Sequence, residues 1–477
     1  MPRAFTPLKS ALFLLLTLTL FTASYSPVRS ASEPSNPNHP AQTTWTSVTA
    51  IDVYSTILPM IGAAYPDLVD ANDLNAKARV TGWTLSPDGT TLFILFEQRN
   101  GERDMQSCLY TIADQSVVCR PYEAPVPQRD FPEGRLAWAP DGRHIVTHGD
   151  WIVLADDPDL HLIEVGSGVV SNITDDGYEG NVFGSDEEAF FIDYAPFWAP
   201  DSQSIYFFRI ARPSENLWDT QLMNLRLDSE EATVVADLSG VIDGATFAYP
   251  LQVAMSPDGQ RVVILSSNMR DDEIGLSVYS VDLTTGIAEL WVSRETIYPL
   301  VVPTWGEDPR VYGRDVVWSA DGRFVVVALD YEMRYDFGAQ YEELLPMNYL
   351  IIEAASGQVR PLVDISQFPD IETYNSMGGF FAHSPMLGLL TPDGQLVYAT
   401  TENSQNDTRP LTFWSVPLTL DADPVQLSTV EVSFGLLSGK NALQDRMLGT
   451  IASNGVAMVQ SNAAPDAQSA YLLQFSE

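Results

Sequence analysis

The histidines and the acidic runs are the residues of this chain that could do chemistry. His144 and His148 lie at even spacing in an apolar run, so a β-strand would place both on one side. Two such imidazoles can bind a metal ion, although histidines on a strand surface are the commoner arrangement. The acidic runs 156–159 and 271–273 lack the spacing of a helix-loop-helix calcium site. They leave room for a weak calcium site, and we expect no other cofactor and no other metal.

The sequence contains none of the common catalytic motifs. It has no Gly-x-Ser-x-Gly nucleophile elbow, no His-Glu-x-x-His zinc motif, no Walker loop and no dinucleotide fingerprint. An enzyme without these motifs would need carboxylates that converge only in the folded protein. We therefore assign no catalytic residue, and the sequence favours binding over catalysis.

A short turn sequence recurs six times and must position whatever residues act. Pro fixes φ for the first corner of a type I turn, Asp suits the second corner, and Gly accepts the left-handed conformation that follows. Each copy therefore predicts a strand, a tight turn and a second strand. Asn454-Gly455 is itself a strong hairpin signal and predicts a seventh, degenerate copy. The six clear copies are residues 85–89, 138–142, 198–202, 255–259, 318–322 and 390–394.

The residues between successive turns supply about four strands per repeat. In the fourth repeat we expect strands at 251–255, 262–266, 277–282 and 287–292. Four antiparallel strands repeated around an axis predict an all-β, seven-bladed β-propeller, with six or eight blades as alternatives. The last repeat lacks a fourth strand, and residues 46–54 are expected to supply it and close the ring. Such closure removes an exposed sheet edge.

The turn sequence followed by an apolar strand resembles the TolB-like, WD-repeat-like β-propeller repeat of secreted bacterial proteins. The resemblance covers roughly residues 78–461 and rests on the Ser-Pro-Asp-Gly turns that recur in register. It implies the propeller fold. It implies no single activity, because propellers host many unrelated functions.

The N-terminal residues are typical of an exported protein. A basic stub at 1–9 and a short apolar run at 11–23 predict a signal peptide and cleavage region over 1–32. An uncleaved membrane anchor is the alternative. Residues 33–44 are rich in Pro, Ser and Asn and predict a disordered leader, and 45–477 form a single propeller domain. We expect a periplasmic, extracellular or cell-surface location.

The two cysteines also favour export. Cys108 and Cys119 flank a predicted hairpin, and a turn at 113–114 places them directly opposite each other. Opposed residues on neighbouring strands are close enough to bridge. In an oxidising compartment we expect a disulfide, with two buried free thiols as the alternative.

The charge of the chain limits its partners. The net charge is −38, from 25 basic and 63 acidic residues. This opposes binding to a nucleic-acid backbone and to anionic membrane surfaces, so we expect neither as a partner. A basic partner or cations would be attracted, although solubility alone can explain an acidic surface.

Long connections indicate where a partner would bind. In a propeller, the connections from the second to the third strand and from one blade to the next emerge on one face, here named the long-loop face. The long connections are expected at 174–195, 210–219, 293–312, 330–346 and 364–387. Long loops on a rigid scaffold usually carry binding, and aromatic residues with Arg are typical of interface cores. The alternative is that the rings cap the blade core. The candidate binding residues are Tyr178, Phe183, Phe190, Tyr194, Trp218, Arg270, Tyr331, Arg334, Tyr335, Phe337, Phe380 and His383.

These observations together predict a secreted, non-catalytic scaffold that binds a protein or peptide partner through the long-loop face. We expect it to be a monomer. The alternative is a carbohydrate-active enzyme, such as a lyase or glycosidase, or a carbohydrate-binding propeller. Either would use carboxylates and aromatic rings at the mouth of the central channel.

Overall fold

The computed structural model describes most of the predicted propeller. The described residues are 45–70, 77–99, 104–122, 136–148, 159–175, 177, 191–214, 217–229, 231–242, 252–268, 275–305, 310–332, 348–361, 386–401, 408–419, 424–433, 448–461 and 469–476. The chain divides into two compact units, Met1–Ala41 and Gln42–Glu477, and every described residue belongs to the second. The predicted signal peptide and leader lie outside the described residues.

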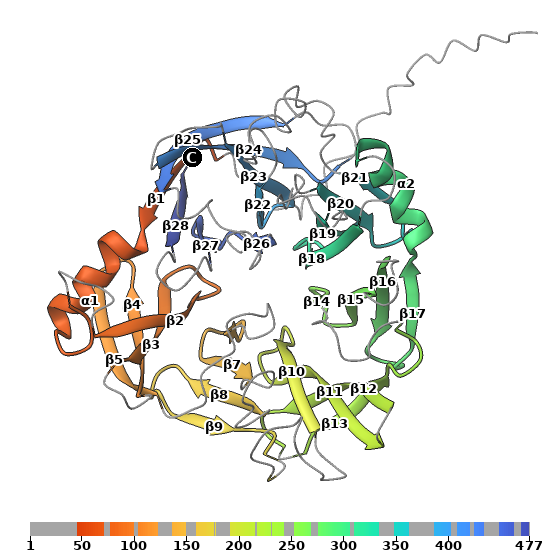
Figure 1. Cartoon of the computed structure of the whole chain (residues 1–477), viewed down its shortest axis with the longest axis horizontal. Coiled ribbons are helices and arrows are strands. Elements are labelled where there is room, and N and C mark those ends of the chain that lie inside the picture. The colour runs from red at the N-terminus through yellow and green to blue at the C-terminus, as the bar shows by residue number, and fades with distance from the viewer. Residues whose placement is uncertain are drawn as a thin grey trace, which may run out of the picture. The chain divides into compact units, whose positions relative to one another are not determined.

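Seven β-sheets surround one axis and form the blades of a propeller (Figure 1). Blades 1 to 6 each contain four consecutive strands in antiparallel order, with the first strand innermost. Blade 1 comprises β2 (Ala78–Leu85), β3 (Thr91–Gln98), β4 (Met105–Thr111) and β5 (Ser116–Tyr122). Blade 2 comprises β6 (Ala137–Trp138), β7 (His144–His148), β8 (Leu160–Glu164) and β9 (Val170–Asn172). Blade 3 comprises β10 (Phe191–Trp198), β11 (Ser204–Ser214), β12 (Leu217–Arg226) and β13 (Thr233–Asp237).

The remaining blades follow the same order along the chain. Blade 4 comprises β14 (Gln252–Met255), β15 (Arg261–Asn268), β16 (Gly275–Asp282) and β17 (Ala288–Val292). Blade 5 comprises β18 (Arg310–Trp318), β19 (Phe324–Glu332), β20 (Asn348–Glu353) and β21 (Val359–Pro361). Blade 6 comprises β22 (Met386–Leu390), β23 (Gln395–Thr401), β24 (Thr408–Pro417) and β25 (Val425–Ser433). The predicted seven-bladed propeller is therefore confirmed.

Blade 7 combines the two ends of the propeller. It contains β27 (Val456–Ser461), β28 (Ser469–Ser476) and the N-terminal β1 (Ser47–Asp52), which pairs antiparallel with β28. This confirms the predicted closure. Its first strand, β26 (Leu448–Thr450), pairs in parallel with β22 of blade 6 instead of with its own blade. Glycines permit the approach, because a Cβ on Gly449 would lie 3.1 Å from Leu389 Cδ2.

The repeated turns adopt the predicted conformation. The final Gly of each copy has a φ between 68° and 83°, and Ser202, which replaces Gly in the third copy, has a φ of 58°. In the blade 4 turn, the Ser256 hydroxyl and the Gln260 N–H both donate to Asp258. These bonds hold the pKa of Asp258 below its usual value. The repeated aspartate is thus occupied by its own turn.

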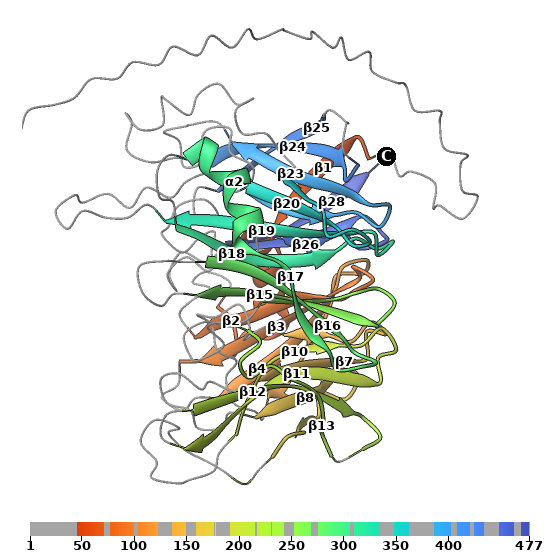
Figure 2. The same ribbon diagram turned by 90° about the vertical axis from the view of Figure 1, so that its right-hand side faces the viewer.

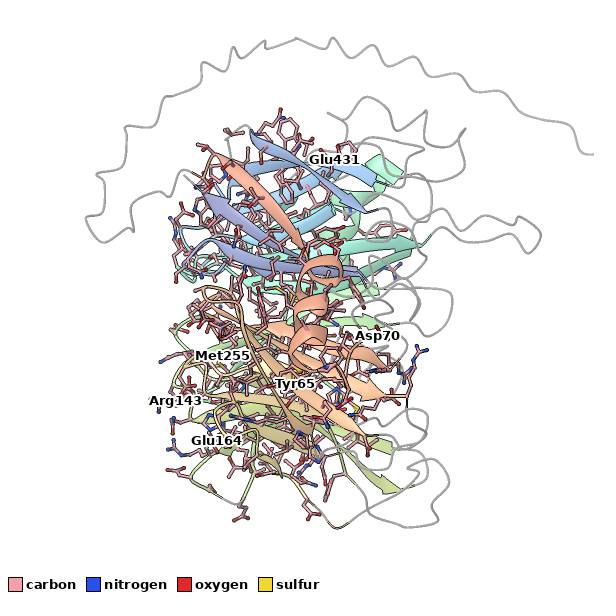
Figure 3. The ribbon with its side chains drawn as sticks, turned by 90° about the vertical axis from the view of Figure 1, so that its left-hand side faces the viewer. Tyr65, Asp70, Arg143, Glu164, Met255 and Glu431 are labelled. Carbon is pink, nitrogen blue, oxygen red and sulfur yellow. A yellow bond between two sulfur atoms is a disulfide. The ribbon has the colours of Figure 1, made fainter. Side chains whose placement is uncertain are left out.

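The same turns connect neighbouring blades. Trp198, which precedes the blade 3 turn, donates its indole N–H to the Ala137 carbonyl of blade 2 at 2.9 Å. Trp318 donates in the same way to Ala254 of blade 4 at 3.1 Å. The tight turns share one side of the ring, here named the plain face, as Figure 2 shows. In Figure 3, Arg143 and Glu164 of blade 2 lie at this edge, and Asp70 lies toward the opposite one.

Two predicted loops are regular structure instead. Residues 210–219 are mostly the paired ends of β11 and β12, whose register continues from Ile210↔Thr220 to Ser214↔Leu217. The polar residues and the proline at this hairpin end resemble a loop in sequence. Residues 293–312 contain helix α2 (Arg294–Trp305) and the start of β18. The helix forms because Ile297 is buried against the core of blades 4 and 5.

A π-helix at Val53–Ile57 and helix α1 (Leu58–Ala64) cover blade 1. Ile57 and Ile61 pack in one apolar cluster with Ile94 and Cys108 of that blade. Within the described residues, none of the helices combines the length and apolar character that crossing a bilayer requires.

A disulfide joins the two outer strands of blade 1, as predicted. Cys108 and Cys119 are directly opposed on β4 and β5 and are bonded. The Cys119 N–H also donates to the Tyr65 hydroxyl at 3.1 Å, and Tyr65 follows helix α1 (Figure 3). The bridge therefore stabilises the layer on which the N-terminal helices pack.

Replacing both cysteines with alanine should lower the free energy of unfolding by about 2–3 kcal/mol, because a bridge that closes a short loop restricts the unfolded chain. Urea unfolding with and without a thiol reductant measures this. Reductant should lower the stability of the wild type to that of the variant and leave the variant unchanged. An unshifted wild type would contradict the prediction.

Candidate functional site

Three of the predicted site residues lie in described strands. Tyr194 on β10 is 5% exposed and packs between blades 3 and 4, with its ring centroid 5.6 Å from that of Phe208. This is the position that the core-capping alternative expects. Trp218 is the second residue of β12 and Tyr331 the last but one of β19, so both lie at strand ends on the long-loop face. The others lie outside the described residues: Tyr178, Phe183, Phe190, Arg270, Arg334, Tyr335, Phe337, Phe380 and His383.

The buried polar side chains differ between the two faces of the propeller. Those near the plain face include the turn hydroxyls of Ser86, Ser256, Ser319 and Thr391, each of which bonds to the aspartate of its own turn. Those near the long-loop ends of the strands include His148, Asp159, His161 and Asp193. Groups that can carry charge are thus buried beneath the face predicted to bind.

The ion pair of Asp193 and Arg209 is the central feature of this face in blade 3. The two residues are cross-strand partners on β10 and β11. Arg209 donates from Nε to Oδ1 at 2.7 Å and from Nη2 to Oδ2 at 2.6 Å. The Asp193 side chain is 1% exposed and that of Arg209 16%. Paired donors and burial hold the guanidinium in one orientation.

Two phenylalanine rings flank the same guanidinium. The Arg209 Cζ lies 4.8 Å from the centroid of Phe191 and 5.6 Å from that of Phe207. Phe207 is fully buried, whereas Phe191, the first residue of β10, is 37% exposed. Phe191 and Asp193 share one side of β10, so the partner of Asp193 is the diagonal neighbour of Phe191. The result is an exposed ring fixed from beneath by a buried ion pair, here named the Phe191 anchor.

The sequence analysis selected Phe190 and did not select Phe191. The missed signal was the pairing of Phe191 and Asp193, two residues apart, with Phe207 and Arg209, also two residues apart. Recognising it requires the register of β10 against β11. That register includes an irregularity between Tyr194 and Phe197, which strand periodicity alone does not locate.

Blade 2 carries a buried polar cluster near the same face. Asp159, from the acidic run 156–159, accepts from Asn172 Nδ2 at 2.8 Å and from the Thr174 hydroxyl at 3.4 Å. His148 is fully buried at the end of β7, so it is not a surface histidine. His144 lies beside the Trp198 ring of blade 3 at a centroid distance of 6.2 Å. A search of the described residues finds no cluster of three or more side chains suited to hold a metal.

Blade 1 places a second ion pair at a related position. Arg79 and Glu97 are cross-strand partners on β2 and β3, and the Arg79 guanidinium donates to the Glu97 carboxylate. The Arg79 side chain is 36% exposed, so water screens this pair more than the pair in blade 3. In blade 5, Arg310 and Glu332 are likewise opposed at the ends of β18 and β19.

No protein-family model matches the chain, and no curated protein matches its sequence. Among solved structures, the chain is similar to an oligogalacturonate lyase from Vibrio parahaemolyticus, with 10% identity, 91% of this chain and 99% of that chain covered, and a TM-score of 0.49. It is also similar to a putative TolB from Agrobacterium tumefaciens, with 11% identity, 78% and 98% covered, and a TM-score of 0.35. A third is the Kuenenia stuttgartiensis hydrazine synthase, with 17% identity, 71% and 77% covered, and a TM-score of 0.41. These proteins share the propeller fold, and their different activities leave the function to be argued from this chain's own residues.

Substituting alanine for Asp193 should lower the free energy of unfolding by about 3–5 kcal/mol, because it leaves the Arg209 charge buried without its partner. Substituting alanine for Glu97 removes the same kind of group from the more exposed pair and should cost no more than about 1 kcal/mol. Urea unfolding of the two variants measures the difference. Equal losses would show that the blade 3 pair is not a buried charge pair of this kind.

Proposed function

We propose that this chain is an exported, non-catalytic scaffold that binds a protein or peptide partner through its long-loop face. The observation that carries the proposal is the Phe191 anchor. A large apolar ring stands exposed at the end of an inner strand, directly above a guanidinium fixed by a buried carboxylate. Aromatic anchors next to Arg are typical of the residues that dominate interface energetics.

Preorganisation is the physical advantage of this arrangement. A flexible exposed ring loses rotational freedom when a partner covers it, and that loss reduces affinity. The Phe191 ring lies against the Arg209 guanidinium, whose two bonds to Asp193 fix its plane. Much of the ordering is therefore complete before a partner arrives.

Charge supports a basic partner. Residues 173–190, which lead from blade 2 into Phe191, contain six acidic residues and no Lys or Arg. The whole chain carries a net charge of −38. A field of this sign attracts a basic segment and raises its association rate at low salt.

Two features support function outside the cytoplasm. The Cys108–Cys119 bond is a structural bridge of the kind that persists in oxidising compartments. The predicted signal peptide over residues 1–32 agrees with this. Together they support a partner that is met after export.

Peptides selected from a random display library on the immobilised protein should be basic and contain an aromatic or large aliphatic residue. Phe191→Ala should weaken their binding about 30-fold, which corresponds to about 2 kcal/mol, because it removes the anchor of the interface. Ile287→Ala is the matched control, since Ile287 is 61% exposed in a plain-face turn of blade 4. Its affinity should match that of the wild type.

The affinity of the selected peptides should fall as salt concentration rises, because screening weakens long-range attraction. Peptides that bind Phe191→Ala as tightly as the wild type would refute the anchor. A parallel glycan array tests the carbohydrate alternative, since sugars also stack on aromatic rings. Glycan binding that depends on Phe191, with no peptide enriched, would replace the proposed partner class.

A further inference from the structure

The seventh turn differs from the other six at one position. Asn454 stands where each of the others has Asp. Its Oδ1 accepts from the Val456 N–H at 3.1 Å, as Asp258 accepts from Gln260 at 3.1 Å in blade 4. The side-chain oxygen therefore serves the turn in the same way in both blades, and the amide nitrogen is what the substitution adds.

That nitrogen reaches the neighbouring blade. Asn454 Nδ2 donates to the Gly89 carbonyl in the blade 1 turn at 3.0 Å, across 365 positions of sequence. A carboxylate has no hydrogen to donate. An ionised Asp at this position would place an acceptor against the carbonyl oxygen, so Asn alone of the two serves this contact.

The two turns are in close contact. A Cβ on Gly89 would lie 2.3 Å from Asn454 Oδ1 and 2.8 Å from Ala452 Cβ. The corresponding distance from Gly259 to Pro200, between blades 4 and 3, is 3.1 Å. Gly89, with a φ of 70°, therefore lets the turns of blades 7 and 1 approach more closely.

The junction of blades 7 and 1, here named the seam, lies where the two ends of the propeller meet. At its outer edge β1 pairs with β28, and Thr46 donates to the Ser476 carbonyl at 3.0 Å. At its inner edge Asn454 bonds to Gly89. Both contacts join residues 448–476 to the N-terminal part of the propeller without a covalent link. Figure 1 shows β27 and β28 beside β1 and blade 1.

We propose that Asn454 is the ring-closing residue and that the seam is where the propeller opens and closes. The other tight turns keep Asp because they do not make this contact. The Asp-to-Asn change in the seventh copy is thus a device for closure and not a decayed repeat. Opening there separates β1 from β28 and leaves the other blades intact.

Hydrogen exchange of the full chain tests this proposal. Asn454→Asp should lower the protection of amides in β1, β27 and β28 about tenfold or more at neutral pH, since a lost bond and an added repulsion favour local opening. Amides in β15 and β16 of blade 4 should keep their protection. Asp258→Asn is the control, because it makes the reverse exchange in a turn away from the seam, and it should leave the seam unchanged.

Acid distinguishes the bond from a general packing effect. Below the pKa of the introduced carboxyl, its O–H can donate to the Gly89 carbonyl. The protection of Asn454→Asp should then return toward that of the wild type at the same pH. Asn454→Ala has no such group and should not recover. Loss of protection spread evenly over all blades, an equal effect of Asp258→Asn, or no recovery in acid would overturn the proposal.

Discussion

The contact between the turns and strands of neighbouring blades is the constraint on which the rest of this structure depends. A propeller blade is a twisted sheet, and it is stable only when both faces are covered by other blades. On the plain face the chain achieves this with the indole of Trp198 on Ala137, that of Trp318 on Ala254, and the amide of Asn454 on Gly89. Each bond joins one blade to the next around the ring.

This division of labour leaves the opposite face available. The aspartates and hydroxyls of the plain face are occupied within their own turns, and burial and bonding hold them there. On the long-loop face the buried charges are paired across strands, and one pair supports an exposed ring. A rigid ring of sheets with fixed groups at one end is what a binding scaffold requires, because little further ordering opposes association.

Several features were predicted from sequence because they depend on local rules. The spacing of Cys108 and Cys119 about a two-residue turn determined their register, and the structure has the same pairing. Asn454-Gly455 indicated the seventh turn by its chemistry alone. The predictions for 210–219 and 293–312 were wrong, because a polar hairpin end and a proline-containing helix resemble loops until their burial is known.

The sequence by itself determined the number of blades, the closing strand and the disulfide, since each follows from periodicity and turn geometry within short segments. Only the tertiary structure decided which polar groups meet. Asp193 and Arg209 are brought together by a strand register that contains an irregularity, and Asn454 meets Gly89 only because the ring closes. The physical reason is that such contacts depend on where a whole blade lies, and that position is set by packing against its neighbours.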